Sequence, residues 1–85
     1  MTRIMQKILL KDGQTYVFEQ ETGKELSLFS VTPSASVTLQ GVKYPVTKAT
    51  LERCFPLGVS NRILEPTATL TVHSGTVLVV IEGKA

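Results

Sequence analysis

The C-terminal stretch at positions 67–82 reads TATLTVHSGTVLVVIE, and it decides the expected fold. Its first half, 67–73, alternates threonine or histidine with small or apolar side chains, which is the period-of-two pattern of a half-buried β-strand. Ser74-Gly75 follows as a two-residue turn, and positions 76–82 are mostly apolar without alternation. Such a run is typical of a central strand that is covered on both faces. The stretch therefore predicts a β-hairpin whose second strand lies inside a sheet.

Further short strands are expected upstream, at a spacing of roughly eight to twelve residues. Positions 4–10 suit either a strand or one face of a helix. We favour a strand because Asp12-Gly13, a strong hairpin signal, follows at once. Positions 42–44, between a glycine and a proline, are interpreted as a turn or an edge strand. The other expected strands occupy 15–20, 26–31 and 36–40.

One segment, at about 47–55, has the pattern of a short helix. Thr47 suits the N-cap position, where its hydroxyl accepts a hydrogen bond from an amide of the first turn. Leu51, Cys54 and Phe55 then share one face at the i, i+3 and i+4 spacing. We therefore expect a mostly β fold, a small barrel or sandwich of five to seven short antiparallel strands with one short helix. We expect it to form a single domain over residues 1–85.

The composition indicates a folded, mildly basic chain with apolar surface to spare. Of the 85 residues, 42% are hydrophobic and 19% are charged, and the formal net charge is +2. The mean hydropathy of +0.16 is high for so small a domain, in which surface residues dominate. We interpret the excess of apolar residues as an interface for a protein partner or for a second copy of the chain.

Cysteine usage and the N-terminal sequence favour a cytoplasmic location. Cys54 is the single cysteine, so it forms no internal disulfide, and an unpaired cysteine fits a reducing compartment. Residues 1–7 are interrupted by charges and do not have the pattern of a signal peptide. The longest apolar run, 77–81, is far shorter than a membrane-spanning helix. We therefore expect a cytoplasmic protein without membrane association.

Residues suited to catalysis are few. Cys54 and His73 are the only cysteine and histidine, too few for a structural zinc site. A catalytic pair of the two is disfavoured, because Cys54 falls on the expected buried helix face and His73 adjoins a turn. Glu19, Glu21 and Glu25 flank another turn, where charges are normally solvated. Glycine-rich phosphate-binding signatures are absent from the sequence. The expectation is a protein that is not an enzyme and that uses no cofactor and no metal.

A basic segment at positions 43–62 is the one candidate binding surface with a distinct charge pattern. It contains four cationic side chains and one acid, Glu52, together with an aromatic ring. Cationic side chains beside an exposed ring suit contacts to a phosphate backbone and to stacked bases. A merely solvated surface explains the same pattern, since four charges over this length are common. The candidate binding residues are Lys43, Tyr44, Lys48, Arg53 and Arg62.

These observations favour a non-enzymatic interaction module that binds a protein partner or itself, as a regulator, inhibitor, adaptor or assembly subunit. The feature behind this hypothesis is the strand 76–82, which is apolar on both faces in a chain with little to cover it. Its outward residues Leu78 and Val80 are the expected interface of a homo-oligomer. The alternative is a small nucleic-acid- or nucleotide-binding β-barrel that uses the basic segment 43–62.

Overall fold

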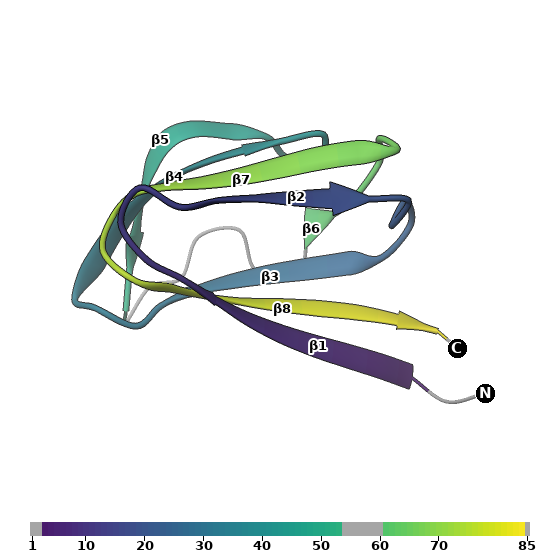
Figure 1. Ribbon diagram of the computed structural model, residues 1–85, viewed down its shortest axis with the longest axis horizontal. Helices are drawn as coiled ribbons and strands as arrows, with labels where there is room; N and C mark the ends of the chain where they lie inside the picture. Colours follow the sequence, from purple (N-terminus) through teal and green to yellow (C-terminus); the bar gives the residue numbers. More distant parts are fainter. Residues whose placement is uncertain (1–2, 54–60, 85) are drawn as a thin grey trace.

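Two four-stranded antiparallel sheets face each other in the computed structural model, which describes residues 3–53 and 61–84 (Figure 1). Sheet A has the strand order β1-β8-β3-β6, and sheet B has the order β2-β7-β4-β5. This arrangement confirms the expected mostly β architecture and makes it a sandwich. The strands are β1 (Arg3–Leu10), β2 (Thr15–Glu19), β3 (Glu25–Ser30), β4 (Ser34–Gln40), β5 (Val46–Glu52), β6 (Asn61–Arg62), β7 (Thr67–Ser74) and β8 (Val77–Lys84).

The core lies between the sheets and is built from every second residue of most strands. Ala68, Leu70 and Val72 of β7 are buried, as their alternation with polar residues predicts. In β8 the inward set is Val77, Val79 and Ile81, and β1 and β3 flank the strand, which confirms its central position in a sheet. The expected cover on both faces is only partial, because Leu78 and Val80 on the outer face are half-buried. The largest fully buried side chains are Phe18, Leu26, Leu28, Leu39, Leu51, Ile63, Leu70, Ile81, Val37, Val72, Val77 and Val79.

The expected hairpins do not form, although their strands and turns do. β7 pairs with β2 and β4 in sheet B, whereas β8 pairs with β1 and β3 in sheet A. The turn at Ser74-Gly75 therefore carries the chain from one sheet to the other, and the turn at Asp12-Gly13 does the same between β1 and β2 (Figure 1). The turn residues predict correctly that the chain reverses, but they do not determine whether the two flanking strands pair with each other. Here each of the two strands has an apolar face, and the strands pack these faces against each other across the core instead of pairing.

The expected helix at 47–55 is wrong over its described part, because residues 46–52 form β5, which pairs with β4. Lys48 has a φ of 48° and lies at a shift in the β4–β5 register. The irregularity sets the partly buried Val46 and Ala49 three residues apart, so the strict alternation of a regular strand is broken here. Cys54 and Phe55 lie outside the described residues. No described segment is a helix long and apolar enough to cross a membrane.

Candidate functional site

Tyr44 presents an aromatic ring to solvent at the edge of sheet A. At 59% exposure it is the most exposed of the large hydrophobic side chains that the structure describes. The Nζ atom of Lys43 lies 5.4 Å from the centroid of the ring. A cation at that distance is attracted by the negative face of the ring. The ring is therefore an available stacking surface that already attracts a positive charge.

The segment that carries Tyr44 is bound to β6. Val42 and Ile63 form an antiparallel bridge, and the Lys43 N–H donates to the Arg62 carbonyl oxygen at 2.8 Å. Asn61 is only 1% exposed, and its side-chain amide bonds the main chain of Tyr44 on both sides. Segment 42–44 thus lies against β6 through one isolated bridge and is not a strand of sheet A, so of the two expected alternatives it is closer to a turn than to an edge strand.

A glycine, Gly41, allows the chain to pass close to β7 just before segment 42–44. Gly41 has a φ of 81°, a conformation that other residues rarely adopt. A Cβ atom at this position would lie 2.8 Å from the Thr67 carbonyl oxygen and 2.9 Å from the Ala68 Cα atom. The Gly41 carbonyl oxygen also accepts hydrogen bonds from the N–H groups of Leu64 and Glu65, at 3.0 and 3.1 Å. Gly41 therefore fixes where segment 42–44 leaves β4 and meets β6.

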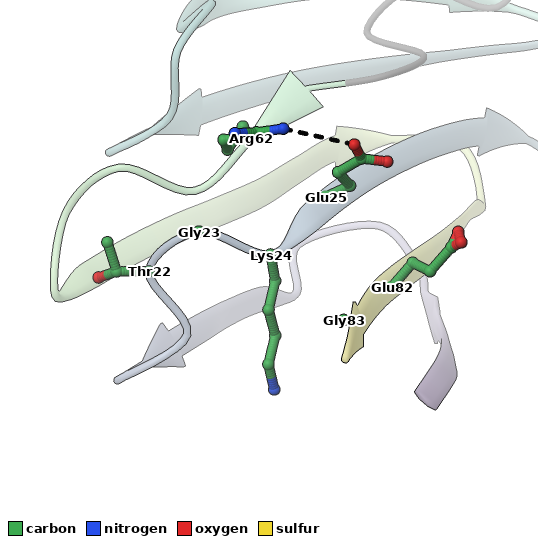
Figure 2. Close-up of a pocket in the computed structure, with 7 residues that line it drawn as sticks. All are labelled: Thr22, Gly23, Lys24, Glu25, Arg62, Glu82 and Gly83. Carbon is green, nitrogen blue, oxygen red and sulfur yellow. Dashed lines mark hydrogen bonds and ion pairs between the residues drawn. The ribbon is translucent and has the colours of Figure 1, made fainter. Parts of the chain in front are cut away.

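A polar cleft of about 510 Å³ lies at the end of sheet A and shares Arg62 with this edge (Figure 2). Arg62 Nη2 lies 3.5 Å from Glu25 Oε1, and both side chains are more than half exposed, so this ion pair adds little stability. Glu25 and Glu82 are direct register partners on β3 and β8, an arrangement that is unfavourable without a nearby cation. The lining residues are Thr22, Gly23, Lys24, Glu25, Arg62, Glu82 and Gly83.

The structure brings together only part of the basic segment. Lys43, Tyr44 and Arg62 lie side by side through the pairing of segment 42–44 with β6. Lys48 lies in β5 of sheet B, where its N–H donates to Thr38 Oγ1 at 3.0 Å. Arg53 follows β5, and its N–H donates to the Pro33 carbonyl oxygen at 3.2 Å. The contacts described above join three of the five residues, whereas those of Lys48 and Arg53 go to β4 and to the β3–β4 connection.

Asn61, which sequence reasoning missed, is the buried residue that supports Tyr44. The pattern Asn61-Arg62-Ile63 alternates buried, exposed and buried side chains. A polar residue at an inward position of an extended segment is a usable signal, because buried amides require hydrogen-bond partners. The hydrogen-bond partner, Tyr44, is 17 positions away, so a local sequence pattern does not identify it.

The proposed interface residues Leu78 and Val80 lie on the outer face of sheet A and are half-buried. Leu78 stands in register with Leu9 of β1 and Phe29 of β3, which are both exposed. Leu9 and Phe29 therefore continue the apolar surface around Leu78 on this face. Their assignment to an oligomer interface stays a prediction.

His73 lies on the outer face of sheet B. Its Nε2 atom is 2.7 Å from Thr38 Oγ1, and on the same sheet Thr15 Oγ1 is 3.1 Å from Thr71 Oγ1. Cys54, its possible catalytic partner, lies outside the described residues. Within the ranges 3–53 and 61–84, no group of three or more histidine, cysteine, aspartate or glutamate side chains is placed to hold a metal ion.

Comparison with protein families gives one match, and it covers most of the chain. Residues 14–77 match the family described as "Thiamin pyrophosphokinase, vitamin B1 binding domain". The matched range contains segment 42–44, β6 and most of the cleft lining. None of the curated proteins matches the chain.

The solved structures with the same fold include proteins from three bacteria. The chain is similar to thiamine pyrophosphokinase from Bacillus subtilis, with 19% identity and a TM-score of 0.78. It is similar to thiamin pyrophosphokinase from Geobacillus thermodenitrificans, with 21% identity and a TM-score of 0.74. For a thiamin pyrophosphokinase family protein from Enterococcus faecalis the values are 21% and 0.68. Each match covers 98% of this chain but only 38% of the other.

These matches overturn the functional expectations drawn from the sequence. A non-enzymatic module that binds a protein partner, itself or nucleic acid is wrong, because the matched family is defined by a small-molecule ligand. The expectation that the chain has no place in an enzyme is wrong for the same reason, since the family is named for a pyrophosphokinase. The apolar composition of β8 is explained on its inward face by the sandwich core, which buries Val77, Val79 and Ile81.

Proposed function

The chain belongs to the thiamin pyrophosphokinase vitamin B1-binding domain family, and on that premise we propose that it binds thiamin. It would supply the substrate-recognition part of a thiamin pyrophosphokinase, because it spans 38% of the length of the solved structures that it matches. The proposal retains a cytoplasmic location, where an unpaired cysteine such as Cys54 stays reduced.

Tyr44 is the observation that carries the proposal. Thiamin joins an aminopyrimidine to a thiazolium ring that bears a permanent positive charge. A flat cationic ligand of this kind is recognised by stacking on an exposed aromatic face, which is the usual protein device for quaternary nitrogen cations. Tyr44 offers such a face, and Lys43 Nζ already lies over it at 5.4 Å. We therefore place the thiazolium or the aminopyrimidine against the Tyr44 ring.

The basic neighbours of Tyr44 take a different role from the one that the sequence suggested. Lys43 and Arg62 carry the same charge as thiamin, so neither attracts it. Arg62 is paired with Glu25, whereas Lys43 Nζ lies over one face of the ring and would compete there with a cationic ligand. The cleft is the competing location, because Glu25 and Glu82 would attract a cation and its volume of about 510 Å³ falls in the range of ligand pockets.

The test is a calorimetric titration of the chain with thiamin. We expect Tyr44→Ala to weaken binding by about tenfold or more, because a desolvated cation–π contact contributes about 2 kcal/mol. Tyr44→Phe keeps the ring and should bind almost as tightly as the wild type. Leu64→Ala is the matched control, because it removes a comparably exposed apolar side chain from the residues that follow β6.

Two results would contradict the proposal in different ways. If the wild-type chain fails to bind thiamin, the function itself is wrong. If Tyr44→Ala binds normally while Glu25→Gln loses binding, the ligand lies in the cleft and the assignment to Tyr44 is wrong.

A further inference from the structure

Asn61 is a buried polar residue whose three recorded hydrogen bonds all go to the main chain of the proposed thiamin site. Its Oδ1 atom accepts from the Tyr44 N–H at 3.1 Å and from the Arg62 N–H at 2.9 Å. Its Nδ2 atom donates to the Tyr44 carbonyl oxygen at 2.9 Å. Only this orientation of the amide satisfies all three contacts. In the described part of the chain no buried side-chain polar atom lacks a partner.

The amide replaces the peptide group that a continuing β-ladder would supply. Segment 42–44 pairs with β6 through the Val42–Ile63 bridge and the Lys43–Arg62 bond. At Tyr44 the pairing passes to the Asn61 side chain, which offers one donor and one acceptor as a peptide does. An apolar residue would fill this buried position without the cost of desolvating an amide. The presence of a buried amide at position 61 is therefore explained by its hydrogen bonds to the main chain of Tyr44.

What it holds is the backbone from which the exposed ring projects. Pro45 follows Tyr44 and restricts it to extended conformations, and the Asn61 amide fixes its peptide groups on both sides. The direction of a side chain depends on the backbone dihedrals of its own residue. A fixed backbone therefore limits the directions in which the ring faces solvent. The backbone of Tyr44 is then already ordered in the free protein, so ligand binding does not have to order it.

We infer that Asn61 is a positioning residue for thiamin recognition, which acts by locking the main chain of Tyr44 so that the ring is preorganised for stacking. The inference rests on the proposed function and deepens it. Asn61 need not touch the ligand, because its polar atoms are taken by the main chain of Tyr44 and Arg62. Asn61 would raise thiamin affinity by increasing the fraction of molecules in which the Tyr44 ring has the orientation that stacking needs.

The first test is a double-mutant cycle on thiamin affinity. Asn61→Asp keeps the size and the acceptor but loses the Nδ2 donor, and we expect it to weaken thiamin binding about tenfold as the competent fraction falls. In a Tyr44→Ala background the same substitution should change affinity by less than about twofold, because two groups that act as one unit are non-additive. Ser30→Ala is the matched control, since Ser30 is also buried and bonds the Thr32 carbonyl oxygen.

The outcomes of the cycle separate this inference from the function on which it rests. If Asn61→Asp weakens thiamin binding by the same factor in the wild-type and Tyr44→Ala backgrounds, Asn61 has a general structural role and the inference is overturned. Normal thiamin binding by Asn61→Asp would also overturn it. A wild-type chain that does not bind thiamin overturns the proposed function instead. Tyrosine fluorescence in a Tyr16→Phe background reports the ring directly, because Tyr44 is then the only tyrosine and the chain has no tryptophan.

A second measurement needs no variant and holds even if Asn61→Asp does not fold. In the wild-type protein the Tyr44 amide should exchange its hydrogen at least about a hundredfold more slowly than an open amide, although its side chain is exposed. Exchange of the Tyr44 amide at the rate of an unprotected peptide would mean that Asn61 does not hold this segment, and the inference would be overturned.

Discussion

Lys43 and a cationic ligand would compete for one face of the Tyr44 ring. The ammonium group lies 5.4 Å from the ring centroid, and such an exposed contact is worth about 0.5–1 kcal/mol. A bound thiazolium must displace it and then tolerate its charge. We expect Lys43→Gln to tighten thiamin binding about twofold to fivefold, measured by calorimetry.

The control for Lys43→Gln is Lys48→Gln, which removes the same charge from β5 of sheet B. It should leave thiamin affinity nearly unchanged, because Lys43 is the cation that lies over the Tyr44 ring and salt screening weakens an exposed charge that does not contact the ring. Equal tightening by both variants would point to long-range repulsion, and weaker binding by Lys43→Gln would mean that Lys43 supports the ligand.

Gly41 is the residue at which the site depends most directly on backbone conformation. A Cβ atom there would meet backbone atoms at 2.8 and 2.9 Å in addition to the strain of a φ of 81°. We expect Gly41→Ala to lower the free energy of unfolding by roughly 2–3 kcal/mol in urea denaturation. Gly13→Ala is the matched control, because its φ is 78° but nothing lies within 4 Å of the added atom. It should cost only about 1–2 kcal/mol. Equal losses would contradict the steric argument.

At the scale of the element, the irregularity between β4 and β5 is stabilised by one hydroxyl. Thr38 Oγ1 accepts the Lys48 N–H at 3.0 Å and lies 2.7 Å from His73 Nε2. Thr38→Val keeps the shape and leaves that amide without its acceptor, so we expect a loss of about 1–2 kcal/mol in the free energy of unfolding. Thr69→Val, on the neighbouring β7, should be close to neutral. A neutral Thr38→Val would mean that water replaces the hydroxyl without cost.

The same elements explain how much of the fold could be predicted from sequence. Strand positions were predictable because alternation is local, and β7 buries the three residues that its pattern assigns. Strand pairing was not predictable, because the residues Ser74-Gly75 suit a turn between paired strands and a turn between strands of two facing sheets equally well. The helix predicted at 47–55 rests on Thr47 as a possible N-cap and on the spacing of Leu51, Cys54 and Phe55, whereas the structure forms β5 over the first part of that segment. Local pattern therefore identifies strands better than it identifies their neighbours.

The candidate site was predictable only in part, for a related reason. Tyr44 and Lys43 were found as an exposed ring beside a cation, a property of adjacent residues. Asn61 was missed because its role depends on contact with a residue 17 positions away. Lys48 and Arg53 were included because they are near in sequence, although sheet B carries Lys48 and the β3–β4 connection holds Arg53.

At the scale of the whole molecule, the site edge and the core are parts of one structure. Segment 42–44 leaves β4 of sheet B and pairs with β6 of sheet A, so it spans the two sheets at their edge. Val42 and Ile63 of that pairing are buried in the common core. A ligand that binds only when this edge is formed must therefore stabilise the entire sandwich.

This linkage gives a measurable melting-temperature shift. A ligand that binds only the folded state adds about 2.7 kcal/mol when present at one hundred times its dissociation constant. For a domain of this size each kcal/mol raises the midpoint by roughly 4–8 °C, so saturating thiamin should raise it by about 10–20 °C. Thiamin is supplied as a chloride salt, so the reference sample needs matching sodium chloride. At the same thiamin concentration, a tenfold weaker Tyr44→Ala should gain only about 1.4 kcal/mol, so its melting shift should be about half that of the wild type or less. If its shift equals that of the wild type, the stabilising contact lies elsewhere on the fold, and the cleft variant Glu25→Gln becomes the one whose shift must vanish.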